Sequence, residues 1–193
     1  MRVTAIPPES QTTMRWRNGG GLTREIYSCP AGDSFHWRAS VARIDSSGAF
    51  SAFPGYQRWI SLLDGGPLRL QFDAQADLQL QPRLRAFSFA GAAAPIAQLD
   101  GDFAIAFNLM VAEGLPSAQL MPRPLVGNMV IFDQAHTDWL IYMISGEAHL
   151  RVGEQRHWIG EQHALLLEGE GSPTRALLDG GGEVVLVKIT KAA

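Results

Sequence analysis

Apolar and polar positions alternate in short runs along most of the chain, and glycine or proline separates the runs. Alternation with a period of two residues predicts β-strands, because successive side chains of a strand point to opposite faces of a sheet. The runs recur about every ten residues, a spacing typical of a sandwich or a barrel. We therefore expect an all-β protein with at most one short helix, near 117–121 or 133–137.

The expected strands fall into two groups on either side of a proline-rich stretch. The stretch Glu113–Pro124 contains three prolines and is interpreted as a loop, so we expect one domain over residues 1–112 and a second over 113–193. The first group comprises 3–6, 23–29, 35–44, 56–63, 68–72, 77–80, 84–89 and 103–111. The second group comprises 128–132, 139–145, 148–152, 162–167 and 184–190.

The two halves resemble each other around one strand, turn and strand. Residues 59–70 read WISLLDGGPLRL and residues 140–151 read LIYMISGEAHLR, so each has an apolar strand, a glycine-containing turn and an alternating strand. This arrangement is the centre of a cupin barrel. The repeat indicates that this centre is present twice, once in each half, although a similarity this short is only suggestive.

An arginine lies on the apolar face of the strand expected at 56–63. Alternation puts Tyr56, Arg58, Ile60 and Leu62 on one face of this strand. Burying a guanidinium without an acceptor is costly, so a carboxylate or an anionic ligand should accompany Arg58. Two interpretations remain open: Arg58 pairs with Asp45, Asp64 or another internal acid, or it stands at the mouth of a ligand cavity.

Alternation leaves the inward face of the preceding strand undecided. If Arg38, Ser40, Ala42 and Ile44 point inward, Arg38 and Ser40 join Arg58 in the cavity; otherwise Arg38 is a solvated surface charge. On the strand at 103–111, Asn108 lies among small residues, which leaves room for a ligand or for a neighbouring strand.

Three consecutive glycines, Gly19 to Gly21, separate Asn18 from the strand at 23–29. A phosphate-binding loop is disfavoured, because no Gly-Lys-Ser/Thr is present and no helical pattern follows. The glycines either form a plain loop or bring Asn18 and backbone N–H groups close to a strand end.

Composition and charge exclude several classes of partner. The chain has 193 residues, is 46% hydrophobic and 18% charged, and carries a net charge of −3, so it predicts a packed globular protein without a nucleic-acid surface. No apolar run approaches the roughly 20 residues that span a bilayer, and no signal peptide is recognisable. The single cysteine, Cys29, fits a reducing compartment. We expect a cytoplasmic protein that binds neither nucleic acid nor membrane, and a homodimer built by pairing sheets is plausible.

The chain resembles the HutD/Ves family in several blocks of sequence. These blocks are WRNGGGLTRE at 16–25, WRASVA at 37–42, GAFSAFPGYQR at 48–58 and FNLM at 107–110, with Leu22 standing where a small polar residue is more usual. The resemblance implies a bicupin fold, two small jelly-roll-like β-barrels packed together in one chain, with the ligand pocket expected in the first. It also implies a non-catalytic accessory role in histidine utilisation, with ligands such as N-formylglutamate or urocanate. Relatives of the Ves type are instead associated with environmental stress.

Metal-dependent and nucleophilic chemistry have little support in the sequence. A metal cupin needs two histidines two residues apart, but the corresponding place holds Tyr56-Gln57-Arg58, and no His-x-His occurs elsewhere. No Gly-x-Ser-x-Gly elbow is present. Glu25 is the only acid inside the blocks of resemblance and could neutralise Arg24 or Arg58. We therefore expect no metal, no cofactor and no catalytic residue, and a metal-free isomerase or hydrolase of a small carboxylate remains the alternative.

The leading hypothesis is a pocket for a small anionic ligand. Arg58, together with Arg38 if that strand face is inward, would bind a carboxylate, amide and hydroxyl side chains would bind the other end, and aromatic rings would exclude water. The candidate ligand-binding residues are Trp16, Asn18, Gly19, Gly20, Thr23, Arg38, Ser40, Phe53, Tyr56, Arg58 and Asn108.

Overall fold

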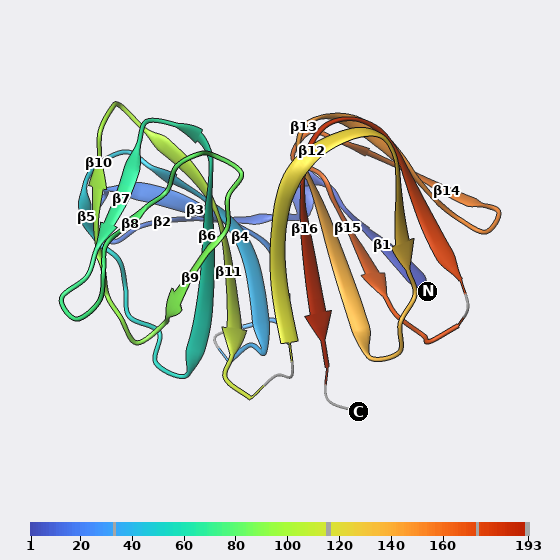
Figure 1. Cartoon of the computed structure of the whole chain (residues 1–193), viewed down its shortest axis with the longest axis horizontal. Helices are drawn as coiled ribbons and strands as arrows, with labels where there is room; N and C mark the ends of the chain where they lie inside the picture. The colour runs from blue at the N-terminus through green and yellow to red at the C-terminus, as the bar shows by residue number, and fades with distance from the viewer. Residues whose placement is uncertain (33, 115–116, 173, 192–193) are drawn as a thin grey trace. The chain divides into compact units, whose positions relative to one another are not determined.

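The structure, a computed structural model, describes residues 1–32, 34–114, 117–172 and 174–191, and it confirms the expected all-β class (Figure 1). Within these residues the only helical element is a single 3₁₀ turn, η1 (Pro8–Ser10). Neither place expected to hold a short helix does so, because 117–121 is extended and 133–136 forms a turn. Among the described residues, none forms a helix with the length and hydropathy needed to cross a membrane.

The chain divides into two compact units, Gln11–Gly114 and Leu115–Ala193, and the second unit also includes Met1–Ser10. The pairing of the first strand explains why residues 1–10 belong to the second unit. Strand β1 (Arg2–Ile6) pairs antiparallel with β15 (Ala164–Glu168), from Arg2 opposite Glu168 to Ile6 opposite Ala164. Residues 1–10, which the sequence analysis assigned to the first barrel, therefore complete a sheet of the second unit. A short strand can be recognised from its own residues, but its partner cannot.

The unit 11–114 is a sandwich of two antiparallel sheets. One sheet has the order β2 (Thr12–Arg15), β3 (Gly21–Cys29), β4 (Trp37–Ile44), β11 (Ala104–Ala112), β6 (Tyr56–Gly65), β9 (Phe87–Ala90). The other has the order β5 (Gly48–Ala49), β10 (Ile96–Leu99), β7 (Leu68–Gln71), β8 (Leu78–Gln79). Ile44 and Ile60 from the first sheet pack against Leu68 and Leu70 from the second in a shared core, where each is fully buried. Each such side chain stabilises the fold by about 1.5–3 kcal/mol relative to leaving it in water.

Strands β2, β5 and β10 of this unit were not expected from the sequence, and neither was the segment 155–160, which forms strand β14 of the second unit. All four residues of β2 are exposed, and β5 is only two residues long, so neither has an apolar face that would produce alternation. These strands form because neighbouring strands offer backbone partners, which a pattern of side chains does not record.

Register in the larger sheet arranges the chemically interesting side chains in rows. Met110 of β11 lies between Arg38 of β4 and Arg58 of β6, and in the next row Asn108 lies beside Ser40. Because side chains in one row of adjacent strands share a face, Arg38, Ser40, Asn108 and Arg58 all project from the same side of the sheet. The open question about the strand at 35–44 is thereby resolved in favour of the face that carries Ser40.

The second unit is built from three strands of 16 residues that arch over the core (Figure 1): β12 (Ser117–Phe132), β13 (Thr137–Val152) and β16 (Arg175–Thr190). The N-terminal part of β13 pairs with β15, and its C-terminal part pairs with β14 (Gln155–Gly160). The same long strands therefore contribute to both sides of the core, which contains Leu125, Ile141, Leu150 and Leu186.

Several sequence-based boundaries in this half are wrong for that reason. Residues 117–124 belong to β12 instead of a loop, the expected strands 139–145 and 148–152 are the two ends of β13, and 184–190 is the second half of β16. Glycines stand at the bend, where Gly146 and Gly182 have φ of +80° and +130°. A glycine normally indicates a turn between strands, but here it bends one continuous strand.

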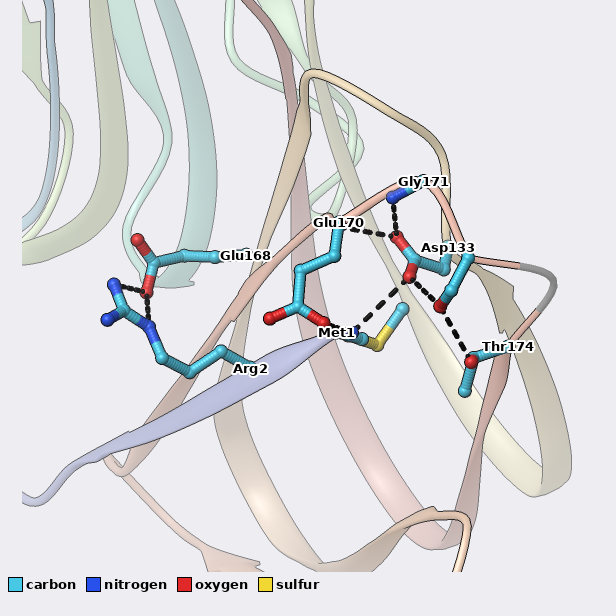
Figure 2. A network of polar contacts seen from close by, with 8 residues as sticks. Met1, Arg2, Asp133, Glu168, Glu170, Gly171 and Thr174 are labelled. Carbon is cyan, nitrogen blue, oxygen red and sulfur yellow. Dashed lines mark hydrogen bonds and ion pairs between the residues drawn. The ribbon is translucent and has the colours of Figure 1, made fainter.

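A polar network around Asp133 fixes the loop that follows β15 (Figure 2). The Asp133 carboxylate accepts hydrogen bonds from Ser172 Oγ at 2.8 Å, Glu170 N at 3.1 Å and Gly171 N at 3.3 Å, and lies 3.4 Å from the Met1 amine. Burial alone would raise the pKa of Asp133, but the hydrogen bonds from Ser172 and Gly171 and the amine hold it below its ordinary value. The network connects β12 with the segment that leads into β16.

Candidate functional site

A pocket of about 500 Å³ opens in the unit 11–114, on the face of the larger sheet, beside its edge strand β2 and the segment that carries β5. Its floor is the face of β3, β4, β11 and β6 described above, and its walls come from residues 14–18 and 49–53. Its volume suits a small metabolite. The lining residues are Met14, Arg15, Trp16, Arg17, Asn18, Thr23, Ser40, Ala42, Ala49, Phe50, Ser51, Phe53, Arg58, Asn108 and Met110.

Arg58 is the buried cation of this pocket, with 4% of its surface exposed. Its Nη1 donates to the backbone oxygen of Ser51 at 3.1 Å, while its Nε is buried and has no acceptor. The guanidinium carbon lies 4.9–5.6 Å from the ring centroids of Phe89, Phe53 and Phe50. These faces attract a cation but do not neutralise it.

No described carboxylate forms an ion pair with Arg58. Of the internal acids considered as partners, Asp45 instead accepts from Arg43 Nε at 2.7 Å, and Glu25 lies 4.0 Å from Arg38 Nε. Burial, and next the positive charge of Arg38, lower the pKa of Arg58 to about 10. Arg58 therefore still carries its charge near neutral pH, in a pocket where an anion would be stabilised.

Arg38 occupies the same row as Arg58 but lies outside the pocket lining. Its guanidinium carbon is 4.6 Å from the Phe35 ring centroid and 5.4 Å from that of Phe53, and its Nη2 lies 3.3 Å from Met110 Sδ. Glu25 lies beside it, as described above. The two arginines thus differ in environment: Arg38 has a carboxylate nearby, whereas Arg58 forms no ion pair with a described acid.

The aromatic wall is held by contacts among its own members and with the floor. Trp16 Nε1 donates to Thr23 Oγ1 at 2.8 Å, and the Trp16 ring meets the Phe50 ring edge-on with centroids 5.9 Å apart. Phe53 lies close to both Arg38 and Arg58. These contacts fix the wall before any ligand arrives, which lowers the ordering cost of binding.

A glycine turn connects the wall residues 14–18 with strand β3 of the floor. Gly19 has a φ of +73°, and Asn18 Oδ1 accepts from Gly20 N at 3.0 Å. A Cβ on Gly20 would lie 2.9 Å from Ser46 Oγ, and one on Gly21 would overlap the backbone oxygen of Arg43. The glycines therefore permit a tight turn and a close backbone approach, and the side chain of Asn18 is the part of the turn that reaches the pocket.

Polar groups on the floor are placed to bind the remainder of a ligand. Asn108 is 7% exposed, and its amide nitrogen makes only a long 3.4 Å contact with the backbone oxygen of Ala106. Ser40 lies beside it in the sheet register, and Thr23 lies in the next row, beside Ala42. An amide and two hydroxyls can both donate and accept hydrogen bonds.

The pocket unites seven of the residues named from the sequence and leaves four outside. Gly19, Gly20, Arg38 and Tyr56 do not line it. Tyr56 instead supports Phe35, because its hydroxyl donates to the Phe35 backbone oxygen at 3.0 Å and the two rings lie 4.7 Å apart. The seven lining residues are Trp16, Asn18, Thr23, Ser40, Phe53, Arg58 and Asn108.

Eight lining residues were not named beforehand. Alternation places Ala42 on the same strand face as Ser40, and Met110 on the same strand face as Asn108. The blocks of resemblance contain Phe50 and Ser51. Arg15 and Arg17, both exposed, add two cations at the wall. The described lining thus holds three arginines and no acidic side chain. The others are Met14 and Ala49.

The HutD family model matches residues 8–186 of the sequence. This chain belongs to the HutD family. An uncharacterised 21.2 kDa protein in the hutC 3′ region of Pseudomonas putida is 36% identical over 161 residues, 81% of this chain and 82% of that protein. The protein Ves of Cronobacter sakazakii is 34% identical over 180 residues, 91% of this chain and 92% of that protein.

Solved structures agree with this membership and with the fold. A conserved protein of unknown function from Pseudomonas aeruginosa superposes with a TM-score of 0.88, and HutD from Pseudomonas fluorescens, in a formate condition, with 0.81. Each is 26% identical to this chain, and both chains are covered completely in each comparison. A bacterial pirin from Escherichia coli, at 10% identity, has a TM-score of 0.72 with complete coverage of both chains, which shows a shared cupin-like fold alone.

The described residues contain no group of three or more His, Cys, Asp or Glu side chains placed to hold a metal ion. Tyr56, Gln57 and Arg58 begin strand β6, and Arg58 is the member of this group that lines the pocket. The chemistry present at the pocket is that of cations, amides and hydroxyls, which bind anions.

Proposed function

We propose that the unit 11–114 is a receptor for a small carboxylate and that Arg58 binds the carboxylate. The observation that carries the proposal is a guanidinium 4% exposed, facing a pocket, with no ion pair to a described acid. A buried charge is expected to have a partner. A ligand carboxylate would supply it through a charge-assisted hydrogen bond, because Arg58 Nε has no acceptor among the described residues.

The pocket suits a ligand with one anionic end and a planar polar remainder. The aromatic rings of Trp16, Phe50 and Phe53 would cover the body of the ligand, and Asn108, Ser40 and Thr23 would contact an amide, formyl or imidazole group. Urocanate, an intermediate of histidine degradation, has these features. N-formylglutamate, another intermediate, has a planar formamide group and carries two carboxylates, either of which can bind Arg58. HutD membership and the relative in the hutC 3′ region favour this substance class.

The test is a calorimetric titration of both acids into the wild type and into Arg58→Met. Methionine fills much of the same volume without a charge, so the variant removes the ionic hydrogen bond with little change in packing. We expect the variant to lose about 2 kcal/mol or more of binding free energy, which is roughly a 30-fold weaker affinity.

Arg69→Met is the matched control. Arg69 lies on β7 of the same unit, is exposed, and pairs with Asp77 through Nε at 2.9 Å, and it does not line the pocket. Its removal should leave the affinity unchanged. Equal affinities of wild type and Arg58→Met, or no heat with either acid, would contradict the proposal. Conversion of either acid during the titration, seen by product analysis, would favour a metal-free enzyme.

We also propose that binding modulates histidine utilisation in the cytoplasm, where the lone thiol of Cys29 would stay reduced. The family membership supports this role. A strain that lacks the protein should grow differently with histidine as its nitrogen source, and Arg58→Met should fail to restore normal growth. Full restoration by that variant would separate the growth effect from ligand binding.

A further inference from the structure

The C-terminal half of β12 is an uncharged edge strand. Strand order places β12 at the end of its sheet, where among the described residues it pairs only with β16. Residues 124–132 read PLVGNMVIF and contain no charged side chain. Free edges are usually protected by charges, because unpaired backbone groups invite another strand.

Two prolines show which backbone groups of β12 point away from β16. In an antiparallel ladder, residues alternate between directing both N–H and C=O to the partner and directing both away. Proline has no N–H, so Pro122 and Pro124 fit only at positions whose backbone N–H would point away from β16. The register with β16 runs without a shift from Ser117 to Phe132, so Asn128, Val130 and Phe132 also direct their N–H and C=O groups outward.

The exposed side chains of this segment are apolar. Val126, Val130 and Phe132 are 89%, 44% and 62% exposed. Leu125 and Ile131, on the opposite face of the strand, are each 2% exposed and belong to the core. Val130 lies opposite Leu177 of β16 in the register, which extends the apolar surface by one strand. An apolar row beside a free edge is the arrangement that strand addition uses.

The geometry points to a homodimer in which β12 pairs antiparallel with β12 of a second copy of this chain. A two-fold axis near Val130 places Val130 opposite its own symmetry mate and Asn128 opposite Phe132. The pairing brings no like charges together, and Gly127, with a φ of +71°, marks where the straight edge begins. Because the segment is its own complement, a second copy satisfies it without any other partner.

The paired segment is short, so the interface is at the small end of stable contacts and the dimer should be weak. We expect a dissociation constant of about 1–100 µM. The test is sedimentation velocity on the full-length protein over concentrations from about 1 µM to 1 mM. The wild type should change from monomer to dimer across this range.

Val130→Pro is the decisive variant, because it removes an outward N–H while keeping the hydrogen bonds to β16. The chain already accommodates proline at 122 and 124, in the same alternation. Val130→Lys, which adds a charge at the proposed two-fold axis, is the second variant. Both should fold, as circular dichroism would show, and both should weaken the dimer at least about tenfold.

Ile96→Lys is the matched control, because Ile96 is 48% exposed on β10, a strand of the other unit with partners on both sides. It should dimerise like the wild type. Hydrogen exchange should show slower exchange of the Asn128, Val130 and Phe132 amides at high protein concentration. A wild type that remains monomeric at the highest concentration, or a Val130→Pro variant that dimerises normally, would overturn the inference.

Discussion

At the scale of single residues, Arg58 combines a stability cost with the binding role that we propose for it. Its charge is desolvated, and the positive charge of Arg38 adds to the cost, which together lower its pKa to about 10. The contacts with three phenylalanine rings offset part of this cost. Residues held in an unfavourable environment by the fold are typical of functional sites.

Arg58→Met should therefore stabilise the ligand-free protein while weakening binding. Replacing a buried charge that lacks a counter-ion by an apolar side chain of similar volume should raise the free energy of unfolding by about 1–3 kcal/mol. The measurement is urea denaturation of both proteins without ligand. A loss of stability would mean that the ring contacts and the bond to Ser51 outweigh desolvation and that Arg58 is structural.

The pH dependence of this gain has a definite sign. A lowered folded-state pKa means that protonated Arg58 destabilises the fold at every pH below about 10, and the penalty fades only as pH rises through that value. The difference between the two proteins should therefore be the same at about pH 6 and pH 8.

Sequence reasoning found Arg58 because it stands out: a cation on an apolar face. Asn108, Ser40 and Trp16 followed from alternation and from the blocks of resemblance. Arg38 and Tyr56 have equally suggestive positions in the sequence, yet neither lines the pocket. Arg38 lies near the Phe53 ring, and Tyr56 donates a hydrogen bond to the backbone oxygen of Phe35. Alternation fixes the face of a strand on which a side chain lies, but only packing decides which of two neighbours reaches the cavity.

At the scale of elements, the second unit depends on bends within long strands. Gly182 has a φ of +130°, and a Cβ there would overlap the backbone oxygen of Ser145. Its neighbour Gly181 has no heavy atom within 4 Å of such a Cβ. The sequence GGG at 180–182 indicates a turn between strands, but the structure shows a bend through which the pairing of β13 and β16 continues.

Gly182→Ala should destabilise the protein strongly, and Gly181→Ala should not. The first variant meets both an unfavourable φ and a backbone clash, so we expect a loss of about 2–4 kcal/mol. The second should change the free energy of unfolding by at most about 0.5–1 kcal/mol. Thermal denaturation of the two variants makes the comparison, and similar melting temperatures would show that the bend does not require glycine.

At the scale of the whole molecule, every residue that lines the pocket comes from the unit 11–114. The other unit takes its first strand from the start of the chain, so the two units are interleaved in sequence. The periodicity of the sequence was sufficient to predict the all-β class, because alternation and turn spacing are local, whereas the bicupin arrangement was implied by the resemblance to a family. The origin of β1 could not be predicted, because it depends on pairing across more than 150 residues, as between Ile6 and Ala164.

The family membership and the pocket point to the same kind of molecule. The HutD match spans residues 8–186, which includes all of the pocket lining. The fold is shared with a pirin at 10% identity, so the fold alone does not choose a ligand. The proposed ligand rests instead on the side chains that line the pocket, above all on the buried guanidinium of Arg58.

A structure of the protein crystallised with N-formylglutamate, and separately with urocanate, tests the central claim most directly. The account predicts a ligand carboxylate within hydrogen-bonding distance of the Arg58 guanidinium, with the rest of the ligand between Phe53 and Asn108. An empty pocket at saturating concentrations of both acids, or a ligand bound away from Arg58, would contradict it.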